Sequence, residues 1–252
     1  FDWEYPEVLH WGHVQIDEYD VKMSTSTIKE RIENGDLTGW DDPRAPTIKS
    51  LRRRGIRGEA IVDAMVDLGL STSDVDLAMS SVYANNRDLI DDETDRCFLV
   101  REGEEFPLAG EDRPDAGEPP VHPDHEDRGT RTIRAGDAVL LESDDVPADG
   151  ERVWLKGFGC FRLDDGTLHW DGQDIDDVRE EGVPVVHWVP AEENVPVRMR
   201  TLEGDVWGHA EAGLREYDTD EMVQFERVGF VRVDELPEQG DGEELTVYFA
   251  HR

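Results

Sequence analysis

The chain has 252 residues, of which 61 are acidic and 26 basic, so its formal net charge is −35. Seven Trp and eight Phe, set in clear apolar periodicities, exclude a wholly disordered acidic chain, and the length allows two or three domains. Only four basic residues are lysines, which leaves 22 arginines among the 26. This combination predicts a protein from a high-salt cytoplasm. Because the Debye length is roughly 3 Å at 1 M salt, such an acidic surface can still bind a polyanion.

Cysteine usage and hydropathy further limit the classes of protein to which this chain can belong. Cys97 and Cys160 lie far apart and form no CxxC pair, so they predict neither a zinc site nor a disulfide framework. No apolar run approaches the roughly 20 residues that span a bilayer, and there is no signal peptide, which predicts a cytoplasmic location. The chain starts at Phe1, in a segment typical of the middle of a domain, so we expect a piece of something longer.

The first predicted elements are a strand and a short helix. Alternating apolar residues at Val14 and Ile16 predict the strand. Ser26 or Thr27 is a suitable N-cap for the helix, and Gly35 is a typical stop.

Three more helices are predicted before residue 90. Thr47 can cap a helix that has Ile48 and Leu51 on its apolar face. Apolar residues at helical spacing predict a second helix over 56–68, which a glycine follows, and a third over 71–89. Together these helices indicate a small helical bundle.

After Val100 the character of the sequence changes. Residues 102–130 hold five of the 13 prolines and predict a long irregular connection. Short strand-like runs then alternate with turns and predict barrels or sandwiches. His187 and Trp188 are expected to pack between such barrels. The runs are 132–133, 138–141, 152–155, 160–163, 183–189, 195–202, 222–233 and 245–250.

Five segments, in one order, resemble archaeal-type, halophilic glutamyl-tRNA synthetases, class I enzymes closely related to glutaminyl-tRNA synthetases. The segment Lys22 to Ser26 is similar to the KMSKS signature loop, with Thr25 where the signature has its second lysine. GWDDPRAPTIKSLRRRGI, at 39–56, resembles the family's GWDDPR and LRRRG segment. Three others resemble the anticodon-binding region: HPDHEDRG (122–129), VVHWVP (185–190) and VQFERVGFVRVD (223–234).

The resemblance implies an α+β fold with three parts. The end of a class I Rossmann catalytic domain would occupy 1–27, and a helical stem-contact domain 28–98. Two antiparallel β-barrels that bind the anticodon would occupy 99–252. The distal barrel would lie at about 190–225, with the C-terminal strands returning to the proximal barrel.

The activity implied by the resemblance is ATP- and Mg²⁺-dependent attachment of glutamate to tRNA by the intact enzyme. This chain would be its tRNA-binding C-terminal half, a monomer or paired with its catalytic half, and its partner would be tRNA-Glu, with tRNA-Gln left open. The HxGH pattern of His10 to His13 precedes a strand instead of opening a helix, so the working motif is expected upstream and the chain alone is expected to be inactive. The alternatives are a non-catalytic tRNA-binding module, a truncated product and a glutaminyl-tRNA synthetase.

The signature-like loop is the first candidate site. In class I synthetases the loop's hydroxyls, amides and a cation stabilise the departing pyrophosphate. The resemblance gives this role to Lys22, Met23, Ser24, Thr25 and Ser26. A hydroxyl-rich N-cap for the following helix is the structural alternative.

The second candidate site is a basic segment. Residues 44–57 carry six positive charges and no acidic residue, a pattern typical of phosphate contacts that position a nucleic acid without reading its sequence. A solvated helix face is the alternative, and Arg44 could instead pair with Asp41 or Asp42. The predicted contacts to the tRNA backbone are Arg44, Lys49, Arg52, Arg53 and Arg54.

The third candidate site would read the anticodon. Unpaired bases are recognised by stacking and by hydrogen bonds to their edges, and the resemblance places Arg96, Gln224 and Arg227 at such positions. Lys156 is a further candidate. An ion pair between Arg227 and Glu226 or Glu235 is the structural alternative.

Overall fold

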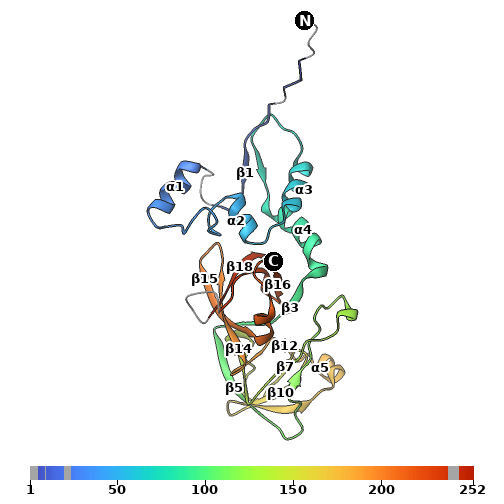
Figure 1. Cartoon of the computed structure of the whole chain (residues 1–252). Coiled ribbons are helices and arrows are strands. Elements are labelled where there is room, and N and C mark those ends of the chain that lie inside the picture. Colours follow the sequence, from blue (N-terminus) through green and yellow to red (C-terminus); the bar gives the residue numbers. More distant parts are fainter. Residues whose placement is uncertain (1–4, 9, 20–23, 238–243) are drawn as a thin grey trace. The chain divides into compact units, whose positions relative to one another are not determined.

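Figure 1 shows the chain as a computed structural model, which describes residues 5–8, 10–19, 24–237 and 244–252. The fold is α+β, with many strands and few helices. The chain divides into two compact units, Phe1–Asp91 and Asp92–Arg252, each described here by itself. The division precedes the expected boundary at residue 98, because residues 95–101 pair with strands from later in the chain. Among the described helices, none is long and apolar enough to cross a membrane.

The first unit contains a short parallel pair of strands, β1 (Val14–Ile16) and β2 (Val75–Leu77). The prediction of β1 is confirmed. The helix predicted over 71–89 is wrong at its start, because 75–77 pair with β1 and the helix α4 runs only over Met79–Ile90. The methyl side chain of Ala78, at the N-cap position, cannot accept a hydrogen bond. The Asp17 carboxylate instead accepts a hydrogen bond from the Met79 N–H, at 3.0 Å. A tertiary contact therefore sets the start of α4.

Three helices lie between these strands in the sequence. They are α1 (Thr25–Glu33), α2 (Ile48–Arg53) and α3 (Gly58–Leu68). The N-cap of α1 is Ser24, two residues before the predicted Ser26. Gly35 follows the helix with φ +82, a conformation that favours glycine.

The start of α2 agrees with its prediction. Thr47 is the N-cap, and its hydroxyl accepts the Ser50 N–H at 3.0 Å. Leu51 is 2% exposed, whereas Ile48 is 65% exposed, so the two do not share a buried face as predicted. The helix has only six residues, and of these Ser50 and Leu51 are buried.

In the second unit, one seven-stranded sheet, called the first sheet, has the order β3-β16-β17-β18-β14-β15-β4. Alternate residues of its strands are buried, as in β14, and form one apolar core. The strands are β3 (Asp95–Cys97), β4 (Leu99–Arg101), β14 (Asn194–Arg200), β15 (Asp205–Glu211), β16 (Met222–Phe225), β17 (Gly229–Glu235) and β18 (Leu245–His251).

The other seven-stranded sheet, the second sheet, has the order β12-β9-β10-β11-β5-β8-β13 and its own core. Its strand β5 lies in the segment predicted to be irregular; Phe106 is the only fully buried side chain of β5, so its alternation is weak. The helix α5 (Ile175–Glu181) was not predicted. The strands are β5 (Gly103–Ala109), β8 (Ala138–Glu142), β9 (Arg152–Leu155), β10 (Gly159–Asp164), β11 (Thr167–Gly172), β12 (Val185–Val186) and β13 (Val189–Pro190); β6 (Ala116–Gly117) and β7 (Ile133–Arg134) form a separate pair.

Both sheets are nearly closed. The two end strands of the first sheet, β3 and β4, are separated in the chain by Phe98 alone, and those of the second, β12 and β13, by His187 and Trp188. Since successive Cα atoms are about 3.8 Å apart, the ends of each sheet must lie beside each other. Each sheet is therefore barrel-like. Neither is purely antiparallel, because β14–β18, β16–β3, β11–β5 and β12–β9 are parallel pairs.

The strands divide between the sheets differently from the prediction of a distal barrel at about 190–225. β14 and β15 pair with β18 and β4 in the first sheet, while residues 103–190 build the second. The links that close the sheets meet: the rings of Phe98 and His187 stack at 4.6 Å. Trp188 is fully buried and its Nε1 donates to the Lys156 carbonyl at 3.0 Å. His187 thus packs between the sheets, as expected, whereas Trp188 belongs to the core of the second sheet.

Candidate nucleic-acid interface

The hydroxyl-rich loop leads directly into α1. Lys22 and Met23 lie outside the described residues. Ser24 has an extended backbone, and its hydroxyl hydrogen-bonds the Ser26 hydroxyl at 2.8 Å instead of capping the helix. The N–H groups of the first helical turn therefore have no side-chain cap from Ser24, and such groups favour anions. Thr25 is the first residue of the helix itself.

The turn before α2 is organised by Asp42, whose side chain is buried. Its carboxylate accepts hydrogen bonds from the Thr38 N–H at 3.0 Å and from Arg44 Nε at 2.9 Å and Nη2 at 2.7 Å. Burial acts to raise the pKa of Asp42, but the hydrogen bonds from Arg44 and Thr38 outweigh it and hold the pKa well below its usual range. Arg44 thus fixes the turn, the alternative role considered for it.

Arg54 is enclosed and does not belong to the basic surface predicted from the sequence. Its side chain is 1% exposed, and its guanidinium donates to Glu18 at 3.1 Å, to the Tyr19 hydroxyl at 3.1 Å and to the Tyr83 hydroxyl at 2.6 Å. A guanidinium held in this way cannot reach a phosphate at the surface. The prediction that Arg54 contacts a tRNA backbone is therefore corrected.

The exposed cations of α2 are Lys49 and Arg52. Within the described part of the chain, no carboxylate forms an ion pair with either of them, whereas Arg53 pairs with Asp41 at 2.8 Å. Both side chains come from one short helix three residues apart, so they project from the same face. They form the part of the basic segment best suited to phosphate contact.

Two of the predicted anticodon residues are brought together. Arg96 on β3 and Gln224 on β16 are register partners, and Gln224 lies opposite Phe230 on β17. The Arg96 guanidinium lies 5.9 Å from the centre of the Phe230 ring and donates to the Thr94 carbonyl at 2.8 Å. Arg96 is 4% exposed, while Gln224 is partly exposed. The three side chains form a row on one face of the first sheet.

Arg227 lies in the turn after β16 with φ +65. Its guanidinium binds the Asp145 carboxylate through two bonds, at 2.5 and 2.9 Å, and these bonds raise the pKa of Arg227. Its ion-pair partner is thus Asp145, not Glu226 or Glu235, yet half of its side chain stays exposed. Lys156 differs, since its ammonium is hydrogen-bonded to the partly buried Glu226 and is 29% exposed.

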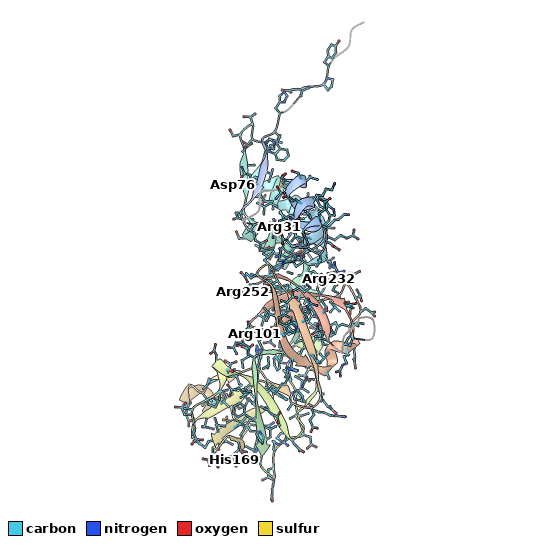
Figure 2. The ribbon with its side chains drawn as sticks, turned by 90° about the vertical axis from the view of Figure 1, so that its left-hand side faces the viewer. Arg31, Asp76, Arg101, His169, Arg232 and Arg252 are labelled. Carbon is cyan, nitrogen blue, oxygen red and sulfur yellow. The ribbon has the colours of Figure 1, made fainter. Side chains whose placement is uncertain are left out.

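Sequence reasoning missed one surface residue, Trp207 on β15, which is 57% exposed. Together with Arg101 and Asp205 it lines a cavity of about 610 Å³. Arg101, labelled in Figure 2, is held by Glu142 at 2.8 Å. The run 205–211 alternates weakly because only its last two residues are buried, so the strand and its exposed Trp were not predicted.

Comparison with known proteins gives matches over the second unit and over the whole chain. Residues 94–180 and 185–234 match two families, both described as "tRNA synthetases class I (E and Q), anti-codon binding domain". The chain is 63% identical over 251 residues to the glutamate--tRNA ligase of Natronomonas pharaonis and 60% identical over 255 residues to that of Haloarcula marismortui. It is 40% identical to the glutamate--tRNA ligase of Methanothrix thermoacetophila. These alignments cover 99 to 100% of this chain but only 43 to 44% of each relative, so the chain spans less than half the length of these relatives.

Proposed function

This chain belongs to the class I tRNA synthetases for glutamate and glutamine, with their anticodon-binding domains at 94–180 and 185–234, and we propose from this premise that it is the tRNA-binding C-terminal half of a glutamate–tRNA ligase. The observation that carries the proposal is identity of 56 to 63% to glutamate--tRNA ligases of halophilic archaea along the whole chain. The net charge of −35 is consistent with the same high-salt setting. The proposed partner is tRNA-Glu, in the cytoplasm.

The proposed role of the loop at Lys22 to Ser26 is to stabilise the phosphates of ATP in the intact enzyme. Support comes from the resemblance to the signature loop and from the uncapped first turn of α1. Within the described ranges, no group of three or more His, Cys, Asp or Glu side chains is placed to hold a metal ion. From the resemblance we assign ATP and Mg²⁺ to the intact enzyme, with residues 1–27 as the end of its Rossmann catalytic domain.

The first unit is proposed to contact the tRNA backbone through α2. Lys49 and Arg52 are the main candidates, because both are exposed and carry unneutralised charge. Arg44 and Arg53 are held by Asp42 and Asp41. They therefore contribute to the local electrostatic potential and do not serve as mobile phosphate contacts. Such contacts position an RNA without reading its sequence.

The two barrel-like sheets are proposed to bind the anticodon. Gln224, in β16, and Arg227, in the turn that follows, offer hydrogen-bonding groups for base edges. Trp207 offers an exposed indole on which an unpaired base could stack. Arg96 is placed to support Gln224 from the neighbouring strand, and Lys156 is proposed to act through Glu226.

The test is binding and activity of the purified chain in multi-molar KCl. We expect it to bind tRNA-Glu more tightly than a transcript with an altered anticodon, and to give no glutamate-dependent ATP–pyrophosphate exchange. Equal binding of both transcripts would contradict the assignment of anticodon recognition. Exchange by the chain alone would contradict the assignment of catalysis to another part of the enzyme. Preferred binding of tRNA-Gln would favour a glutaminyl enzyme.

A further inference from the structure

Strand β16 and the turn after it carry Gln224, Arg227 and, between them, the partly buried carboxylate of Glu226. Glu226 is the first residue after β16, two residues after Gln224 and directly before Arg227. Its N–H donates to the Cys97 carbonyl at 3.1 Å, which continues the pairing of β16 with β3. The turn is closed by the Val228 N–H, which donates to the Phe225 carbonyl at 3.0 Å.

A lysine, an arginine and a histidine surround the Glu226 carboxylate, and none of them comes from the sheet that carries it. Lys156 follows β9 and hydrogen-bonds Glu226 directly. His187 Nε2, from the link between β12 and β13, lies 3.6 Å away. Arg131 Nη2, from the segment before β7, lies at 3.7 Å, a distance for charge attraction and not for a hydrogen bond. The turn of the first sheet is thus held by groups of the second sheet and its connections.

The network continues through the closing links of both sheets. Arg131 Nε binds Glu211 at 2.9 and 3.0 Å, and Glu211 accepts the Phe98 N–H at 2.6 Å. The Arg131 guanidinium lies 4.6 Å above the Phe98 ring, which stacks on His187. Glu211 and Glu226 therefore share Arg131, and the two links cannot shift separately without breaking these contacts.

The Glu226 carboxylate stays ionised in this environment. Burial acts to raise its pKa, but the contacts with His187 and Lys156 outweigh burial and lower the pKa to about 2. Its side chain is 15% exposed. A partly buried carboxylate that stays ionised holds its cationic partners at defined positions, because removal of one charge leaves the others poorly solvated.

We propose that Glu226 is a positioning residue for anticodon recognition. It anchors the segment that carries Gln224 and Arg227 to the second sheet. The inference rests on the proposed function, since it gives a reason for the placement of the two residues that would read the bases. Glu226 itself is directed at Lys156, His187 and Arg131, so it acts through its neighbours.

The test compares Glu226→Gln with Glu235→Gln, an identical chemical change at an exposed position of the same hairpin. Affinities for tRNA-Glu and for an anticodon-altered transcript are measured with the full chain in multi-molar KCl. We expect Glu226→Gln to reduce the ratio of the two affinities at least fivefold and Glu235→Gln to leave it unchanged. Lys156→Met should reduce the ratio as well, and the double variant should be no worse than Glu226→Gln alone.

The readout separates positioning from a merely structural role. If Glu226→Gln lowers both affinities equally, or retains the wild-type ratio, the inference is overturned. If Glu226→Gln fails to fold, Lys156→Met decides in its place: a folded Lys156→Met chain with the wild-type ratio also overturns it. A wild-type chain that does not discriminate between the transcripts overturns the proposed function instead, and this inference with it.

Discussion

Arg96 and Gln224 lie far apart in the sequence but directly opposite each other in the parallel pair of β3 and β16. The partly exposed Gln224 therefore lies beside a buried, hydrogen-bonded arginine. Arg227, three residues later, is oriented by Asp145, which lies just after β8 of the second sheet. The proposed base-reading groups are thus held from two sides, so changes in them should affect discrimination more than general affinity.

The first prediction concerns Arg227. Its substitution by Ala should cost about 1 to 3 kcal/mol of discrimination between tRNA-Glu and an anticodon variant. Affinity for the anticodon variant should change little. Competition binding at fixed KCl measures both quantities. Asp145→Asn serves as the comparison, because it retains the Arg227 guanidinium but removes its ion pair, and it should give a smaller loss of discrimination. An equal loss of affinity for both tRNAs would contradict base reading by Arg227.

A second prediction concerns the exposed indole of Trp207. Trp207→Ala should weaken tRNA binding about tenfold if a base stacks there, and Trp207→Phe should retain most of the affinity. The control is Val185→Ala, which shortens an exposed apolar side chain that is 50% exposed on the second sheet. Retention of full affinity by Trp207→Ala would exclude stacking at this position.

For α2, replacement of Lys49 and Arg52 by Ala should weaken all tRNAs alike. Each lost phosphate contact should reduce the slope of log affinity against log salt concentration by about 1. The measurement is a salt titration with tRNA-Glu and an unrelated tRNA. A change confined to tRNA-Glu would show that these residues read sequence or shape.

Arg54 should act on stability. Arg54→Met leaves Glu18 and two tyrosine hydroxyls without their buried cation, and we expect a loss of about 3 to 5 kcal/mol in the free energy of unfolding of the first unit. Arg52→Met, at an exposed position of the same segment, should change it by less than about 0.5 kcal/mol. Denaturant titration at constant KCl compares the two. Equal effects would contradict the burial of Arg54.

The pH dependence of stability should reveal Glu226. Its pKa is lowered from 4.5 to about 2 in the folded chain, so its contribution is complete above pH 4.5 and is lost as the pH falls through 2. The wild type should exceed Glu226→Gln by about 3 kcal/mol in unfolding free energy near pH 7. This difference should shrink toward pH 2, whereas Glu235→Gln should show no such trend. A difference independent of pH would indicate that packing, and not charge, holds the turn.

The elements best predicted from the sequence are those with local causes. The Thr47 cap and the strand at Val14–Ile16 follow from nearby residues. The start of α4 could not be predicted, because Asp17 and the partner strand of 75–77 come from far along the chain. The same limit applies to β5, whose pairing partners β8 and β11 define it more than its own alternation does.

Site prediction had the same limit. Spacing and charge identified the basic segment, but six cations within 14 residues gave no sign that Arg54 is buried while Lys49 and Arg52 are exposed. A guanidinium is buried where distant acceptors meet it, here Glu18 and Tyr83. The same reasoning explains why the partner of Arg227 was expected among its neighbours in sequence and is Asp145.

The first sheet takes strands from residues 95–101 and from 194–251, and the whole second sheet is encoded between them. In the sequence, the second sheet thus lies entirely between the two parts of the first. Its strands are complete once residue 190 has been synthesised. The first sheet must wait for β18, its central strand, at the very end of the chain. We therefore expect the second sheet to fold before the first sheet can be completed.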